Sequence, residues 1–247
     1  MQIDYFLILI PLIFLAALLF SSVGHGGASG YLAAMALVGV APEQMRPAAL
    51  VLNIFVASIA VFKFHRAGAF SWALFLPLGV ASIPAAFIGG TLSLPSHIYK
   101  PIIGVVLLLA AWHIYRHAKR LDNDTLNKVS VLVLLGVGAG LGFLSGLTGI
   151  GGGVFLSPLL LFFKWGETKV ISGVAAAFIL VNSISGLIGI LQKAPIISSV
   201  LPYWVLAAVL GGLIGAEYGS RRLANPSIRM LLALVLLLAG SKMIFSI

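Results

Sequence analysis

Cysteine is absent from this chain of 247 residues, and aspartate and glutamate together number only six. Without cysteine there can be no disulfides, thiolate metal sites or thiol chemistry. Metal cations at membrane depth usually need several carboxylates, carbonyls or imidazoles, and six acidic residues leave little material for such a site. Charged residues make up 9% of the chain and hydrophobic residues 61%, so polar side chains are too few to cover a water-soluble globule of this size. The composition therefore predicts an integral membrane protein.

Long apolar runs fit this prediction. They approach or exceed the roughly 20 residues that cross a bilayer as a helix, and no strand-length alternation accompanies them. Asp4, where a signal peptide would have a basic region, indicates a first helix that is retained. We expect an all-α polytopic bundle. Its helices are predicted at about 4–20, 43–64, 71–92, 96–116, 129–145, 168–191, 201–221 and 226–245, with short apolar pieces at about 28–39 and 154–164.

Two glycine-rich breaks interrupt the apolar sequence: Gly24-His25-Gly26-Gly27-Ala28-Ser29-Gly30 and Gly149-Ile150-Gly151-Gly152-Gly153. Non-helical backbone survives at membrane depth only where protein or a water-filled cavity surrounds it. Gly26 aligns with Gly151 at an offset of 125, and Asn53 aligns with Asn182 at an offset of 129. This self-similarity predicts a duplicated fold. We divide the chain into a first transmembrane repeat (1–116), a polar linker (117–128) and a second transmembrane repeat (129–247).

The 15 lysines and arginines indicate how the chain turns at each break. If each break only kinked a continuous span, they would divide eight to seven between the two faces. If each break is the turn of a helical hairpin, four lie on one face and eleven on the other, as the positive-inside rule expects. The four are Arg46, Lys100, Lys193 and Lys242. An odd number of passes per half makes the repeats inverted, an architecture common in transporters. Both termini are then predicted outside, and the linker in the cytoplasm.

Helices that begin inside the membrane present unpaired backbone N–H groups and the positive end of the helix dipole. Two such starts, near Ala28 and Val154, are expected to face each other across the pseudo-twofold axis and to form an anion site. The hydroxyls of Ser21, Ser22 and Ser145 could add donors. The alternative is that the glycines only allow close helix packing. The predicted substrate-binding residues are Gly24, His25, Gly26, Gly27, Ser29, Asn53, Thr148, Gly149, Gly151, Gly152, Gly153 and Asn182.

Several polar side chains have two interpretations each. Asn53 and Asn182 either line the site or cap the exposed backbone of the breaks. His25, whose counterpart is Ile150, is either a proton-linked or substrate-contacting group or a neutral imidazole bonded to broken backbone. Arg46 either attracts anions into the outer vestibule or is an interfacial residue that snorkels.

Glu217 is an acidic residue near the predicted cytoplasmic end of its helix. It is most simply an ion-pair partner of Arg221, one helical turn further on. The alternative is that Glu217 carries a proton during transport.

Both breaks also carry a family resemblance. Gly-Ile-Gly-Gly-Gly-Val-Phe-Leu-Ser-Pro, which ends at Pro158, follows Leu-Gly-Phe-Leu-Ser-Gly-Leu-Thr and resembles the hallmark of the sulfite exporter TauE/SafE family of membrane permeases. The first-half Ser-Ser-Val-Gly-His-Gly-Gly-Ala-Ser-Gly-Tyr resembles the equivalent motif of a subgroup, and the resemblance covers essentially the whole chain. It implies a transporter, not an enzyme, for sulfite, thiosulfate or an organosulfonate such as sulfoacetate, in a prokaryotic cell (inner) membrane. Ala28 and Ala33 depart from the commoner form, which leaves open whether both halves contribute equally.

Single features of the sequence are also compatible with two other functions. A divalent metal-cation transporter would use His25. An intramembrane serine protease would use Ser29, because Gly27-Ala28-Ser29-Gly30 matches a rhomboid-type pattern, although the distant His113 lies at the wrong depth for its base. The expected partners are the small anion and the lipid bilayer, with no cofactor and no nucleic acid. The oligomeric state is left open, a homodimer included.

Overall fold

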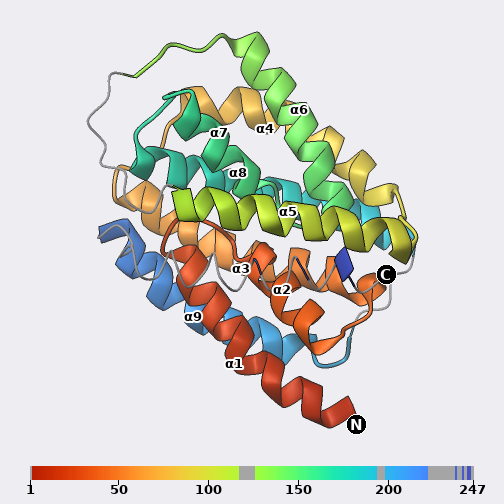
Figure 1. The fold of residues 1–247 in the computed structure, drawn as a ribbon. Helices are drawn as coiled ribbons and strands as arrows, with labels where there is room; N and C mark the ends of the chain where they lie inside the picture. The colour runs from red at the N-terminus through yellow and green to blue at the C-terminus, as the bar shows by residue number, and fades with distance from the viewer. Residues whose placement is uncertain are drawn as a thin grey trace.

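The computed structural model describes residues 2–116, 126–193 and 198–221, together with 237, 241, 244 and 245. Within these ranges the chain is all-helical, as predicted, and forms nine α-helices (Figure 1). They are α1 (Gln2–Ser21), α2 (Ala28–Val38), α3 (Pro42–Arg66), α4 (Trp72–Thr91), α5 (Ser96–Arg116), α6 (Val131–Thr148), α7 (Gly153–Phe162), α8 (Thr168–Leu191) and α9 (Leu201–Arg221). The predicted helix at 226–245, apart from the four residues named, and most of the 117–128 linker lie outside the described residues.

Helix length separates two classes of element. Five helices, α3, α4, α6, α8 and α9, are long and apolar enough to cross a membrane by length and composition. In contrast, α2 has 11 residues and α7 has 10. At the helical rise per residue they are about 15 Å long, roughly half the thickness of the hydrocarbon. Each follows a glycine break directly, so the breaks lead into helices too short to cross the bilayer alone.

The two halves of the chain interlock. Helix α4 of the first half packs against α6 and α8 of the second, while α9 of the second half packs against α1 and α3 of the first. At the centre, α3 and α8 pack against each other. The sequence alignment predicts that α1 is equivalent to α6, α3 to α8 and α4 to α9. The contacts of α4 with α6 and α8 then correspond to the contacts of α9 with α1 and α3, and the contact between α3 and α8 corresponds to itself. Two repeats related by a twofold axis would produce this pattern; their inversion across the membrane stays a prediction.

Glycine residues allow the interlocking helices to pack so closely that their backbones touch. On α6, a Cβ placed on Gly138, Gly142 or Gly146 would lie within 2.5 Å of a carbonyl oxygen of α4. On α9, a Cβ placed on Gly211 or Gly215 would lie within 2.3 Å of a carbonyl oxygen of α1, and one placed on Gly219 would lie 1.9 Å from the carbonyl oxygen of Ser22, directly after α1. Both series recur every fourth residue and therefore line one face of their helix. These are the small-residue interfaces by which membrane helices pack closely.

Contacts at one end of α3 bring together basic residues that the hairpin topology predicts on one face. Arg46, near the start of α3, donates to the carbonyl oxygen of Leu92 at 2.9 Å. Lys193, just after α8, donates through Nζ to Oγ of the adjacent Ser93 at 3.2 Å. The segment after α4 therefore contacts Arg46 and Lys193, two of the four basic residues predicted outside.

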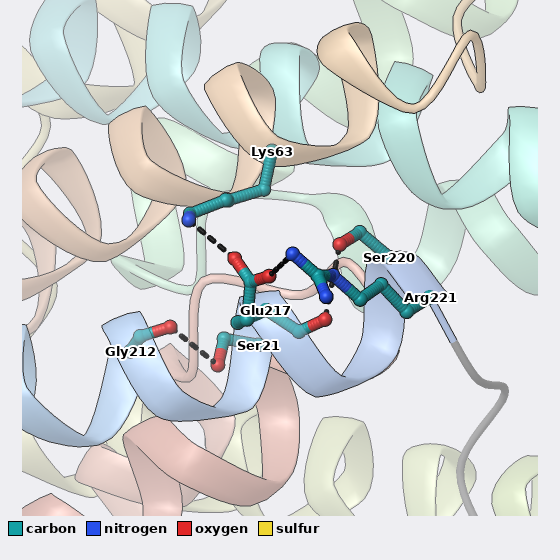
Figure 2. A network of polar contacts seen from close by, with 6 residues as sticks. All are labelled: Ser21, Lys63, Gly212, Glu217, Ser220 and Arg221. Atoms are coloured by element: carbon teal, nitrogen blue, oxygen red, sulfur yellow. Dashed lines mark hydrogen bonds and ion pairs between the residues drawn. The ribbon is translucent and has the colours of Figure 1, made fainter.

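A charged cluster lies at the other end of α3 and joins it to α9 (Figure 2). Glu217 pairs with Arg221, one helical turn away at 2.5 Å, so the predicted ion pair is confirmed. Lys63 of α3 is a second partner of Glu217 that was not predicted. Because these side chains are 31–78% exposed, the pairs contribute little to stability. Nearby, Ser21 donates to the carbonyl oxygen of Gly212 at 3.2 Å and links α1 to α9.

Candidate functional site

Each break ends at a glycine in the left-handed conformation, which starts the following short helix. Gly27, with φ 98°, is the N-cap of α2, and Gly152, with φ 78°, is the N-cap of α7. Gly27 and Gly152 align at the same offset of 125 as Gly26 and Gly151. Neither has a side chain to accept from the first N–H groups of its helix, which have no partners within the helix itself. Both helix starts are buried, so two positive dipole ends lie inside the protein.

The two breaks meet at one pair of side chains, Asn53 of α3 and Ile179 of α8. A Cβ placed on Gly26 would lie 2.7 Å from Oδ1 of Asn53 and 2.9 Å from Cγ2 of Ile179. A Cβ placed on Gly151 would lie 2.6 Å from Nδ2 of Asn53 and 2.9 Å from the same Ile179 carbon. Gly153 approaches Ile179 as well, at 2.3 Å from Cδ1. Only glycine permits these approaches, so the breaks lie on either side of a shared amide and a shared isoleucine.

The amide of Asn53 connects the second break to α8. Its Nδ2 donates to the carbonyl oxygen of Ile150 at 3.4 Å and to Oγ of Ser183 at 3.3 Å. The side chain is 0% exposed, and its Oδ1 has no hydrogen-bond partner among the described residues. Asn53 therefore bonds broken backbone at the second break and leaves an acceptor beside the first.

Asn182, the aligned counterpart of Asn53, bonds differently. Its Nδ2 donates to the carbonyl oxygen of Phe178, one turn earlier in its own helix α8, at 2.8 Å. Its Oδ1 is also buried without a partner in the described part of the chain. The two asparagines are thus equivalent in sequence position but not in the backbone they bond.

Two buried tyrosines hold the backbone beside the breaks. Tyr31 of α2 donates its hydroxyl to the carbonyl oxygen of Gly26 at 2.9 Å. Tyr99 of α5 donates to the carbonyl oxygen of Thr148 at 2.9 Å, at the end of α6. They are 0% and 2% exposed, so each hydroxyl needs the partner that the break supplies. Tyr99 satisfies a carbonyl that the end of α6 would otherwise leave unpaired, and Tyr31 satisfies a carbonyl in the non-helical backbone of the first break.

Other polar groups of the breaks fall into two sets. Nδ1 of His25 lies 3.1 Å from the carbonyl oxygen of Val23, as expected for an imidazole bonded to broken backbone. Thr148 donates to the carbonyl oxygen of Leu144 at 2.6 Å, so its proton is already used. The hydroxyls of Ser29 and Ser145 are 0% exposed and unpartnered within the described residues. Ser29 is in the first turn of α2 and Ser145 lies beside Gly152, so each helix start has an unused hydroxyl donor near it.

Arg46 lies against the second break, because a Cβ on Gly149 would come 3.1 Å from its Cα. Its guanidinium donates to the carbonyl oxygens of Gly89 and Leu92 at the end of α4 and of Gly146 on α6. The positive charge thus faces the negative end of a helix dipole. This cation joins α3, α4 and α6, and neither sequence interpretation of Arg46 anticipated that.

Of the predicted residues, Gly26 and Gly151 meet Asn53 and Ile179 and Gly153 meets Ile179, whereas Gly27 lies against Tyr31, Gly149 against Arg46 and Gly152 against Phe178. Gly24 packs against α8, where a Cβ would lie 2.4 Å from the carbonyl oxygen of Ser172. Asn182 bonds within its own helix. Sequence reasoning missed Ile179, Ser183, Tyr31 and Tyr99. An isoleucine in an apolar helix carries no signal, but Tyr31 directly follows the first break, and its hydroxyl in apolar sequence is a signal for a polar contact there.

Comparison with known proteins places the chain in a family. The family model described as Sulfite exporter TauE/SafE matches residues 9–243. The "Probable membrane transporter protein y4hK" of Sinorhizobium fredii is 39% identical over 235 residues, which are 94% of this chain and 95% of that protein. The "Probable membrane transporter protein MJ0441" of Methanocaldococcus jannaschii is 29% identical over 203 residues, covering 75% of this chain and 74% of that protein. No solved structure matches the chain. With five helices able to span a bilayer and this match over almost its whole length, the chain is a multi-pass membrane protein that belongs to the sulfite exporter TauE/SafE family of membrane transporters.

Proposed function

We propose that the protein is a secondary transporter of a small sulfur-containing anion: sulfite, thiosulfate or an organosulfonate such as sulfoacetate. The transport site is the region where the two breaks meet, beside Asn53 and Ile179. The observation that carries this proposal is the meeting of two buried helix starts beside Asn53 and Ile179. Oriented N–H groups and positive dipole ends favour an anion there.

The chemistry of the site suits an anion that must be released as well as bound. Its donors are backbone N–H groups and the unpartnered hydroxyls of Ser29 and Ser145, all uncharged. Arg46, which lies against Gly149 of the second break, directs its guanidinium to carbonyl oxygens at the end of α4 and on α6. Neutral donors solvate an oxyanion less strongly than a fixed positive charge would. A binding site with this character can exchange its ligand between the two sides of the membrane.

Alternating access follows from how the breaks are packed. Asn53 and Ile179 fill the space between Gly26 and Gly151, so this conformation is closed around the site. The helix pairs α4 with α6 and α1 with α9 are in backbone contact and move as rigid units. Relative movement of these units, with α3 and α8 between them, opens the site to one side and then to the other. If the repeats are inverted, the outward-open and inward-open states arise by the same movement with the two halves of the chain exchanged.

The proposed orientation puts both termini outside a prokaryotic cell membrane and the 117–128 linker inside. It rests on the division of basic residues. The contacts of Arg46 and Lys193 with the segment after α4, and the cluster of Lys63 and Arg221 at the other end of α3, agree with that division.

The direct test is flux in proteoliposomes that contain only this protein. We expect saturable movement of at least one of sulfite, thiosulfate and sulfoacetate, and no movement of divalent metal ions in the same vesicles. Empty liposomes are the control for leak through the bilayer. The Arg46→Gln variant, which is expected to be less stable, is the control for loss of structure. Flux of a divalent cation, or no flux of any sulfur oxyanion or sulfonate by folded protein, would overturn the proposal.

A further inference from the structure

The unsatisfied oxygen of Asn53 is the feature of the site that an anion alone cannot explain. Nδ2 of Asn53 faces the carbonyl oxygen of Ile150, which can only accept, so this side of the amide must be the nitrogen. The oxygen therefore points to Gly26, where a Cβ would lie only 2.7 Å away. The carbonyl oxygen of Gly26 already accepts from Tyr31, and Oδ1 itself has no partner among the described residues.

A buried acceptor without a donor is costly, and this one lies beside the start of α2. An oxyanion whose oxygens are all acceptors gains from the N–H groups of the helix start but is repelled by Oδ1. An anion that also carries an O–H or N–H group can place its oxygens at the helix start and its donor on Oδ1. The site then has no unpaired polar group at this position.

We propose that Asn53 selects for anions that carry a hydrogen-bond donor, such as hydroxy- or amino-sulfonates and hydrogen sulfite, through the unsatisfied Oδ1. This inference rests on the proposed function and names the substrate class of the same site. It makes Asn53 the specificity residue and explains its difference from Asn182, whose nitrogen bonds within α8. The carbonyl oxygen of Ile150 fixes the orientation of the amide, and Ser183 Oγ is a second acceptor for the same nitrogen.

A matched pair of sulfonates tests the inference. 2-Hydroxyethanesulfonate and propane-1-sulfonate have the same charge and the same number of heavy atoms and differ by a hydroxyl in place of a methyl. Both are used as competitors of sulfite flux in proteoliposomes. One neutral hydrogen bond to a group that is otherwise unpaired predicts an inhibition constant about tenfold lower for the hydroxy compound.

Two variants assign the preference to the oxygen of Asn53. Asn53→Leu keeps the approximate shape but has no acceptor, so the ratio of inhibition constants is expected to fall to about one. Ser183→Ala removes a partner of Nδ2 and leaves Oδ1 in place, so the ratio is expected to persist. If Asn53→Leu does not fold, the ratio of the two inhibition constants for the wild-type protein still tests whether the site prefers an anion with a donor.

Equal inhibition by the two sulfonates, or no inhibition by either while sulfite is transported, would overturn the inference and leave the proposed function standing. A preference that survives in folded Asn53→Leu would equally overturn it. Absence of sulfite flux together with absence of flux of any other sulfur anion would instead overturn the proposed function. The outcomes therefore distinguish the two claims.

Discussion

The guanidinium of Arg46 donates to the carbonyl oxygen of Gly146 at 2.8 Å, across 100 positions of the chain. Its other contacts are with carbonyl oxygens at the end of α4, so one side chain joins three helices beside the second break. Gly146 is itself a point where α6 meets the backbone of α4. The charge of Arg46 is therefore used within the fold, in a geometry that needs several N–H groups held in one plane.

Replacement of Arg46 by lysine should cost almost as much stability as replacement by glutamine. Lysine keeps the charge but cannot reach several carbonyl oxygens at once, so we expect a loss of about 2 kcal/mol in either variant. Thermal unfolding of the purified proteins in detergent measures the loss. Wild-type stability for Arg46→Lys together with a destabilised Arg46→Gln would show that charge alone, and not the carbonyl contacts, is what matters.

Two glycines of α6 provide a matched pair for the helix packing. Gly142→Ala places a Cβ 2.5 Å from the carbonyl oxygen of Ser82, whereas a Cβ on Gly140 meets nothing within 4 Å. We expect Gly142→Ala to lose about 1–3 kcal/mol through overpacking. Gly140→Ala should be neutral or slightly stabilising, because alanine is the better helix former. Melting temperatures of the two variants measure this, and equal values would contradict backbone contact between α4 and α6.

The hydroxyl of Tyr99 should contribute to stability through one carbonyl. Tyr99→Phe leaves the carbonyl oxygen of Thr148 unpaired in a buried site, and the expected cost is about 1–3 kcal/mol. Tyr115→Phe, at a side chain that is 60% exposed on the same helix, is the control and should be neutral. Thermal unfolding of both variants is the measurement. A neutral Tyr99→Phe would mean that water or another group can satisfy the end of α6.

Glu217 is expected to be a structural ion-pair residue without a role in proton transfer. It pairs with Lys63 and Arg221 on a partly exposed surface between α3 and α9. Glu217→Gln should therefore change the melting temperature only slightly and leave the pH dependence of flux unchanged. Flux at several pH values in proteoliposomes checks this. A shifted or abolished pH profile in folded Glu217→Gln would restore the proton-carrying interpretation.

The elements of this fold were predictable because apolar runs and glycine punctuation act locally. The predicted pieces at 28–39 and 154–164 correspond to α2 and α7, and the predicted helix at 201–221 matches α9. The helix predicted at 129–145 extends to Thr148, because the chain first adopts the left-handed conformation at Gly149, with φ 80°. Serine and threonine before that glycine did not end the helix.

The partners within the site were not predictable, because they depend on contacts between distant segments. The alignment of Asn53 with Asn182 suggested equal roles, yet only Asn53 bonds the backbone of a break. Ile179 lies between Gly26 and Gly151, and nothing in an apolar helix distinguishes it from its neighbours. Arg46 likewise finds carbonyl partners on two other helices. Sequence periodicity indicates that a helix exists, but not which face meets which neighbour.

The most direct test of the proposed site is sulfur-anion flux through Gly26→Ala and Gly151→Ala in proteoliposomes. Each adds one methyl group within 2.7 Å of the amide of Asn53. Gly136→Ala is the control for Gly26, since both have ordinary backbone and only Gly136 has open space around its Cβ. Gly39→Ala is the control for Gly151, because Gly39 shares its positive φ and likewise has open space. The account predicts that both break variants fold but lose at least tenfold in flux, while the controls retain it. Wild-type flux in folded Gly26→Ala and Gly151→Ala would contradict the claim that the anion crosses where the two breaks meet.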